Sequence, residues 1–154
     1  MFSTVSLGSP ENAVGFILWR LTARYQRETD RAFLPLNLTN LQFVTLALAA
    51  WFERTGEAVS QAELARFGGI QPMQLSLMLK VLEKKGFISR ERNESDTRAK
   101  RVAVTQAGLK TLRKALPIAI DVQERLFGPD GHPDGSLHQT LLELDRASAA
   151  RELE

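Results

Sequence analysis

The sequence contains no cysteine and only two histidines among its 154 residues. Without cysteine there is no disulfide framework, cysteine-ligated zinc site, thiol nucleophile or direct thiol-oxidation sensor. His132 and His138 lack metal-ligand spacing, and no glycine-rich phosphate loop, nucleophile elbow or H-E-x-x-H motif accompanies them. We therefore expect no metal, no cofactor and no catalytic residue. A small enzyme is the weakest of three functional hypotheses.

Long hydrophobic runs are also missing. The longest near-continuous one, Phe43–Phe52, has about half the length that spans a bilayer and is more typical of a buried helix. The first ten residues contain neither a basic segment nor an apolar run, so they do not read as a signal peptide. We expect a cytoplasmic protein without a membrane segment.

Positive charge is concentrated in one part of the chain. Residues 80–114 contain eleven basic and four acidic side chains, a net charge of +7 against +2 for the whole chain. A surface that binds a polyanion would have this distribution. A solvated helix and hairpin would have it too, so charge alone does not decide between them.

Apolar spacing predicts a mainly helical chain. A first helix is expected over residues 11–33, because apolar side chains recur three and four residues apart and Pro35 disfavours its continuation. This apolar face comprises Val14, Ile17, Leu18, Leu21 and Tyr25. Phe16 and Trp19 fall beside it and are available for a second interface.

Two capping boxes predict the starts of the next two helices. Thr39 with Gln42, and Ser60 with Glu63, place a hydroxyl and a hydrogen-bonding side chain three residues apart. The helix after Thr39 is apolar nearly all round, so we expect it at the centre of the core. The helix after Ser60 is short and ends at a Gly-Gly turn.

A second amphipathic helix follows that turn. Pro72 suits its first position, and a core side is expected from Leu75, Met78, Leu79 and Leu82. Two strand-like runs then follow, 87–92 and 101–105, joined by a polar loop over residues 93–100. Two helices joined by a short turn and followed by a basic hairpin form a winged helix.

The remainder is expected to be helical again. Thr105 opens a long helix that Pro117 should bend or interrupt, and residues 128–135 form a glycine- and proline-rich loop. A last helix over residues 136–150 carries Leu137, Leu141 and Leu144 on one face. That face associates with a second subunit or packs on the chain's own first helix, and the sequence leaves both open.

Three segments resemble the MarR family of bacterial transcriptional regulators. They are Leu38–Gln42, Leu82–Ile88 and Asp96–Gly108, which contains an Asp-x-Arg wing signature before a Thr-x-x-Gly helix start. The resemblance covers nearly the whole chain. It implies a homodimer with one winged helix per subunit and a palindromic site on double-stranded DNA. It also implies that Arg98 enters the minor groove and that Asp96 holds the wing by pairing with a nearby basic residue.

The expected fold class is therefore mainly α with a small β-hairpin wing. Residues 1–36 would form an N-terminal dimerisation helix, residues 37–105 the winged helix-turn-helix lobe, and residues 106–154 the C-terminal dimerisation helices, in one compact domain overall. The DNA-binding candidates lie on the helix after the Gly-Gly turn and on the wing. They are Gln71, Met73, Gln74, Ser76, Leu77, Lys80, Lys84, Arg92, Arg98, Lys100 and Arg101.

Leu77 departs from the family pattern. Family members often place a basic residue there, whereas this chain has an apolar residue near the centre of the expected reading face. Leu77 and Met73 either pack on thymine methyl groups in the major groove or contact a protein. The second hypothesis is accordingly a winged-helix protein-interaction module with weak or no sequence-specific DNA binding.

The resemblance further implies release from DNA by a small, often aromatic, anionic effector. Such ligands bind between the dimerisation helices and the DNA-binding lobe, which favours a repressor relieved by a ligand. Aromatic side chains of the first two helices are the candidates for lining that pocket, or else they belong to the core. They are Phe16, Trp19, Phe43, Trp51 and Phe52.

Overall fold

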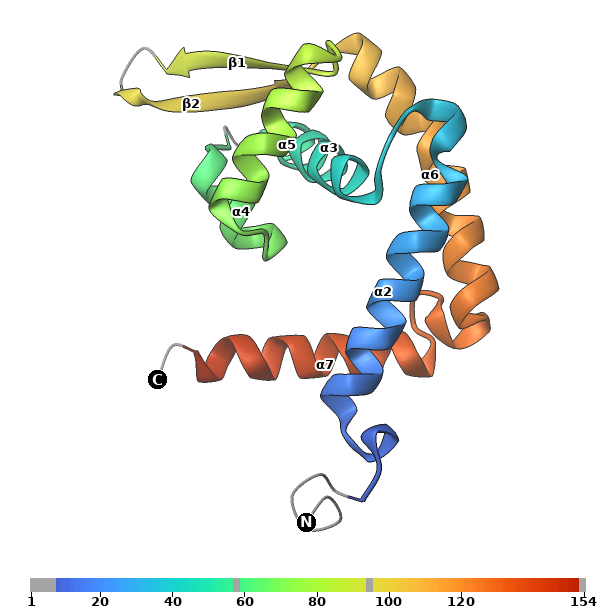
Figure 1. The fold of residues 1–154 in the computed structure, drawn as a ribbon. Coiled ribbons are helices and arrows are strands. Elements are labelled where there is room, and N and C mark those ends of the chain that lie inside the picture. The colour runs from blue at the N-terminus through green and yellow to red at the C-terminus, as the bar shows by residue number, and fades with distance from the viewer. Residues whose placement is uncertain (1–7, 57–58, 94–95, 153–154) are drawn as a thin grey trace. The chain divides into compact units, whose positions relative to one another are not determined.

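The computed structural model describes residues 8–56, 59–93 and 96–152, with the side chains of residues 92–100 left out (Figure 1). Contacts divide the chain into two units. One runs from Thr29 to Ile118, and the other combines the chain up to Glu28 with the chain from Ala119 onward. Two long helices, α2 (Val14–Ala32) and α6 (Gln106–Phe127), each contribute residues to both.

The unit from Thr29 to Ile118 begins with the end of α2 and the short 3-10 helix η2 (Leu34–Leu36). Three helices follow: α3 (Asn40–Arg54), α4 (Gln61–Gly68) and α5 (Pro72–Lys84). Both predicted capping boxes are present: the Thr39 hydroxyl accepts from the Gln42 amide at 3.2 Å, and Ser60 does the same for Glu63. Gly69, at φ 60°, ends α4 in the left-handed conformation that glycine adopts without a steric penalty.

The core of this unit is built around α3, as its apolar composition predicts. Leu46 of α3, Leu64 of α4 and Leu75 of α5 are fully buried. Leu79 and Leu82, one and two turns further along α5, are also fully buried, and Met78 is half-buried. The predicted core side of α5 is thus confirmed, so the opposite side of that helix faces outward.

A two-stranded antiparallel hairpin follows α5. Strand β1 (Ile88–Asn93) pairs with β2 (Asp96–Val104) in a register that sets Ile88 opposite Val104. The predicted loop over residues 93–100 is wrong in length, because backbone pairing continues from residue 96 onward. Main-chain hydrogen bonds form a β-ribbon irrespective of the side-chain pattern, so apolar alternation in the sequence does not mark its full length.

The inner end of β2 has neighbours on both sides. Besides β1, the segment before α4 pairs with it through a Ser60–Arg101 bridge and a 3.3 Å hydrogen bond from the Val102 amide to the Val59 carbonyl. Glu53, near the end of α3, accepts from the Val104 amide at 3.2 Å. The hairpin is therefore fixed at its base to the segments on either side of the α3–α4 connection.

The start of α6 explains the Thr-x-x-Gly motif. The Thr105 amide donates to the Phe87 carbonyl at 3.0 Å, and the Thr105 hydroxyl donates to the Gly86 carbonyl at 2.6 Å. The same hydroxyl accepts from the Gly108 amide at 3.1 Å, as a helix N-cap does. A Cβ at Gly108 would lie 2.1 Å from the Phe87 carbonyl oxygen, so the close approach requires glycine.

Pro117 does not interrupt α6, which is continuous from Gln106 to Phe127. The sequence predicted a bend or an interruption at Pro117, and the interruption does not occur. Proline removes one backbone hydrogen bond from a helix interior. Because Pro117 is exposed, the carbonyl left without that bond lies where water is available.

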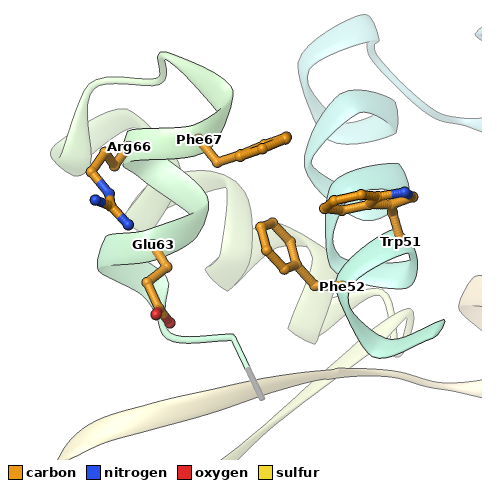
Figure 2. A pocket seen from close by; sticks show the side chains of 5 residues that line it. All are labelled: Trp51, Phe52, Glu63, Arg66 and Phe67. Carbon is orange, nitrogen blue, oxygen red and sulfur yellow. The ribbon is translucent and has the colours of Figure 1, made fainter. Parts of the chain in front are cut away.

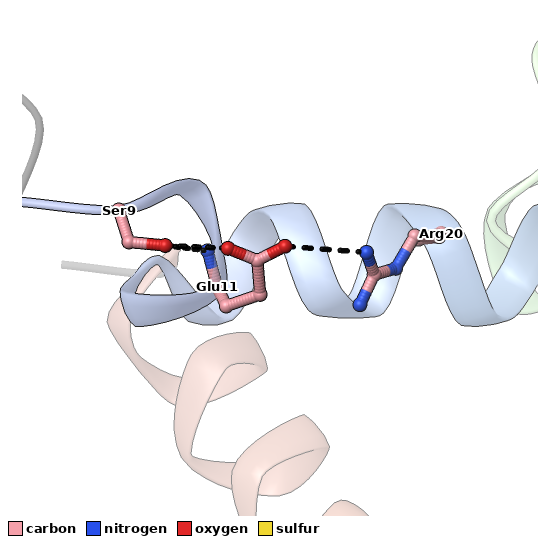
Figure 3. A network of polar contacts seen from close by, with 3 residues as sticks. All are labelled: Ser9, Glu11 and Arg20. Atoms are coloured by element: carbon pink, nitrogen blue, oxygen red, sulfur yellow. Dashed lines mark hydrogen bonds and ion pairs between the residues drawn. The ribbon is translucent and has the colours of Figure 1, made fainter.

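The second unit combines the first part of α2 with the end of α6, the 3-10 helix η3 (Pro129–Gly131) and α7 (Ser136–Arg151). A 3-10 turn, η1 (Pro10–Asn12), precedes α2, so the α-helix starts three residues later than predicted. Figure 3 shows the polar contacts at this turn. Glu11 accepts from the Ser9 hydroxyl and lies 3.6 Å from the Arg20 guanidinium, while Ser9 caps the turn.

This unit buries few large side chains. Val122 is fully buried and Tyr25 packs on Phe127 with ring centroids 5.9 Å apart, but α7 has no buried residue. The predicted apolar face of α2 is mostly exposed, with Val14 at 70%. Among the described residues, no helix is long and apolar enough to cross a membrane.

Candidate nucleic-acid interface

The outward side of α5 gathers most of the predicted reading residues. Met73 is 79% exposed and Leu77 54% exposed. Lys80 and Lys84 are exposed further along the same side, and Ser76 is half-buried. Intervals of four, three and four residues place Met73, Leu77, Lys80 and Lys84 in one stripe along the helix. The stripe is apolar in its first half and cationic in its second.

The beginning of α5 is open to an outside partner. Gln71 precedes the helix without making a side-chain cap hydrogen bond, and both Gln71 and Gln74 are exposed. Pro72 fills the first position, so the unpaired amides of the first turn begin at Met73. Such amides are suited to phosphate oxygens, because they carry the positive end of the helix dipole.

Two basic residues of the charged segment hold α5 in place. Arg90 of β1 contacts Glu83 of α5 through its Nη2 at 2.6 Å and its Nε at 3.1 Å, and its side chain is only 12% exposed. Lys85 donates to the Asn37 carbonyl and, at 2.9 Å, to the Gln42 side chain at the start of α3. Burial lowers the pKa of Lys85. The positive charge of 80–114 is therefore not all available to a polyanion.

The wing residues are described in part. The backbones of Arg92, Asp96, Arg98 and Lys100 lie in the hairpin, with Arg92 opposite Lys100, but their side chains lie outside what the structure describes. The minor-groove role of Arg98 and the pairing role of Asp96 therefore stay predictions. Arg101 is exposed and stands opposite Glu91 in the register.

The aromatic candidates for an effector pocket are divided between the two units of the chain. Phe43 is buried against Phe33, with ring centroids 5.0 Å apart. Phe16 and Trp19 are exposed on α2, at 39% and 74%, in the other unit. Trp51 and Phe52, at the end of α3, form a group of their own.

That group includes a residue which the sequence did not single out. Phe67 of α4 stacks on Trp51 with centroids 5.4 Å apart and planes 19° apart, and meets Phe52 edge-on at 5.2 Å (Figure 2). These rings line a pocket of about 480 Å³ with Glu63 and Arg66 at its polar side. Trp51 and Phe67 keep 45% and 60% of their surface exposed, so the rings form an aromatic wall open to solvent.

The two charged residues of this pocket differ in how many hydrogen bonds hold their side chains. Hydrogen bonds from the amide and hydroxyl of Ser60, the N-cap of α4, lower the pKa of Glu63 and hold its carboxylate in the capping box. Arg66 makes no hydrogen bond or ion pair within the part of the chain that the structure describes. The pocket therefore offers flat aromatic surfaces and the guanidinium of Arg66, whose charge also acts on the nearby Glu63 carboxylate.

Nothing in the described ranges gathers three or more potential metal ligands of the His, Cys, Asp and Glu types. The expectation of no metal site rests on the sequence and is not altered by this arrangement.

Known proteins are similar to this chain in both sequence and fold. Residues 38–100 match the model of the MarR family. The HTH-type transcriptional regulator YdcH of Bacillus subtilis is 36% identical over 118 residues, which cover 77% of this chain and 80% of YdcH.

The solved structures that resemble the chain include MosR and CouR. MosR of Mycobacterium tuberculosis, in complex with DNA, is 27% identical with a TM-score of 0.73 over 90% of this chain and 97% of MosR. CouR of Rhodococcus jostii, bound to p-coumaroyl-CoA, is 26% identical with a TM-score of 0.73 over 88% of this chain and 92% of CouR.

The winged helix, the Thr-x-x-Gly helix start and the identity to YdcH over most of both chains agree with one another. The family regulates transcription and does not consist of enzymes. The chain belongs to the MarR family of transcriptional regulators.

Proposed function

We propose that this protein is a homodimeric, sequence-specific DNA-binding regulator, acting in the cytoplasm as a repressor that a small molecule releases. The observation that supports this most directly is the outward side of α5. It presents Lys80, Lys84 and uncapped first-turn amides on a helix whose other side is fully buried. The similarity to MosR, solved with DNA, adds to this support.

Dimerisation is supported by the apolar surface of the unit that contains α7. Trp19 on α2 is 74% exposed, Ile120 on α6 is 62% exposed and Leu144 on α7 is 54% exposed. Large apolar side chains on three helices of a poorly buried unit are typical of an association surface. Two-fold symmetry would then make the operator palindromic, with half-sites about 34 Å apart, one turn of DNA.

The first test is selection of DNA fragments from the source genome at moderate salt. We expect retention of a small set of fragments that share a short palindrome, in a complex with the mass of two protomers. Binding should weaken steeply as salt rises, because phosphate contacts release condensed counterions.

Two results would contradict this proposal. If retention is equal for all fragments, the protein is not sequence-specific. If one protomer occupies a non-palindromic site, the dimer is wrong. The direction of regulation is measured by placing the selected site in a reporter promoter, where a repressor lowers expression.

The alternative function is a winged-helix protein-interaction module. The exposed Met73 and Leu77 favour it, because apolar side chains in solvent are suited to protein contacts. Removing the charges of Lys80 and Lys84 separates the alternatives: DNA binding should collapse, whereas a protein contact through Leu77 should persist.

For the effector, we propose the pocket of Trp51, Phe52 and Phe67. Its flat rings suit a planar aromatic ligand, and Arg66 suits an anionic group on it. The p-coumaroyl-CoA bound by CouR combines an aromatic acyl group with phosphates, which makes it and free p-coumarate reasonable probes.

Fluorescence can test this pocket, because the chain has only two tryptophans. In Trp19→Phe, where Trp51 alone emits, we expect p-coumarate or p-coumaroyl-CoA to change the emission and to release the operator. Trp51→Ala should leave operator binding intact and raise the concentration needed for release about two- to ten-fold, since one stacking contact is worth about 0.5–1.5 kcal/mol at 1.4 kcal/mol per factor of ten. In Trp51→Phe the remaining tryptophan is Trp19. If the ligand changes the emission of that variant only, the binding site lies on α2 instead.

A further inference from the structure

The apolar half of the α5 stripe is largely uncovered by the residues that the structure describes. Leu75, Leu79 and Leu82 are fully buried on the other side of the helix, whereas Met73 and Leu77 are 79% and 54% exposed. These two lie in the N-terminal half of the helix, one turn apart. They are the part of a recognition helix that faces base edges when such a helix enters the major groove.

The charges along the same stripe indicate what covers it. Lys80 and Lys84 continue the line and are exposed, so a partner that covers Met73 and Leu77 meets two cations within the next two turns. A duplex has this pattern, with base edges in the groove and phosphates at its rim. A protein partner needs roughly 800 Å² on each side, far more than two side chains bordered by lysines supply.

Only one base presents an apolar group in the major groove, and that group is the C5-methyl of thymine. We propose that Met73 and Leu77 read thymine methyl groups, so that each operator half-site has thymine at two positions separated by one base pair. This inference rests on the proposed function. The two side chains are separated by about 6 Å along the helix, from a rise of 1.5 Å per residue, close to two base-pair steps of about 3.4 Å each.

The glutamines beside them are consistent with the same base pairs. Gln71 and Gln74 are exposed at the N-terminal end of α5, and Gln71 is not used as a cap. A glutamine amide bonds both N6 and N7 of adenine, the partner of thymine. The N-terminal half of α5 therefore carries contacts for both bases of an A·T pair and places no basic side chain where guanine would be read.

The test replaces thymine by deoxyuridine, one position at a time, in the duplex selected from the genome. This change removes only the methyl group and leaves every hydrogen-bonding group in the groove unchanged. At two positions per half-site, separated by one base pair, we expect the affinity of the full-length protein to fall about four-fold, the equivalent of ~0.8 kcal/mol per methyl at 1.4 kcal/mol per factor of ten. Substitution elsewhere should change the affinity less than two-fold.

Protein variants assign each methyl to a side chain. At one of the two positions, Leu77→Ala should have the same affinity for the duplex with thymine as for the duplex with deoxyuridine. Met73→Ala should show this equality at the other position. Lys80→Ala is the control: its affinity should fall for both duplexes while the four-fold preference for thymine remains. Because Met73, Leu77 and Lys80 are exposed, these changes should leave the fold intact, and the deoxyuridine series requires no variant.

The inference is overturned if deoxyuridine is tolerated at every position, or if Leu77→Ala keeps the full preference for thymine at all of them. Either result can occur while the protein still binds its operator selectively. Failure of the proposed function looks different, because then no duplex is retained selectively. Loss of capture of a protein partner by Leu77→Ala, with unchanged DNA affinity, would favour the interaction module and also contradict the inference.

Discussion

Gly108→Ala is expected to destabilise the protein by about 2–4 kcal/mol, although glycine is normally the poorer helix former. The added Cβ would lie 2.1 Å from the Phe87 carbonyl oxygen and 2.9 Å from a Val104 methyl group. Overpacking of this kind costs about 1–3 kcal/mol. Moving α6 away would also break the hydrogen bond from the Thr105 amide to Phe87, worth about 1 kcal/mol.

Gly15→Ala provides the matched control. Gly15 lies in the first turn of α2, where an added Cβ would meet nothing within 4 Å. There the helix propensity of alanine should leave stability unchanged or raise it by up to about 1 kcal/mol. Urea denaturation of both variants measures the difference. Equal midpoints would mean that the Thr105–Gly108 turn tolerates a side chain, which contradicts the close approach to Phe87.

The second large effect is expected for DNA affinity when Lys80 and Lys84 are both changed to alanine. A dimer would lose four phosphate-contacting charges, and each contact contributes about 0.9 to the slope of log K against log salt. The slope should shrink by about 3 to 4, and at ~0.15 M salt the affinity should fall on the order of a hundred- to a thousand-fold. The fall should be similar for operator and unrelated DNA, because phosphates carry no sequence information.

Lys110→Ala with Lys114→Ala removes the same charge from exposed positions on α6. If the phosphates are contacted by α5, this control variant should change the slope of log K against log salt by less than one. Equal slopes for the two double variants would show that only the overall charge of the protein matters, and that α5 is not the contacting element. Circular dichroism of both variants checks that the helices persist.

Local signals in the sequence predicted local structure well. Each capping box needs only residues three positions apart, so Thr39 and Ser60 could be identified as helix starts without knowledge of the fold. The buried and exposed sides of α5 followed from helical periodicity for the same reason. The Met73 to Lys84 stripe was therefore available from the sequence.

Long-range contacts were not available. Lys85 and Arg90 contribute to the positive charge of residues 80–114, yet Lys85 bonds residues more than forty positions away and Arg90 pairs with Glu83 across the α5–β1 turn. Phe67 gave no signal of a pocket, because its partner Trp51 belongs to a different helix. Helical spacing also marked the apolar face of α2 without showing that most of it remains uncovered within one chain.

The short pairing of Val59 and Ser60 with β2 has a mechanical consequence. A hairpin with one neighbour per strand can pivot on its own turn, but β2 shares hydrogen bonds with the segment that leads directly into α4. A small rotation at the start of α4 must therefore either lengthen those hydrogen bonds or displace the inner end of β2 in the same direction. The hydrogen bonds at Val59 and Ser60 thus couple the helix-turn-helix to the hairpin. A ligand that tilts α4 by contacting Phe67 would therefore also shift the hairpin.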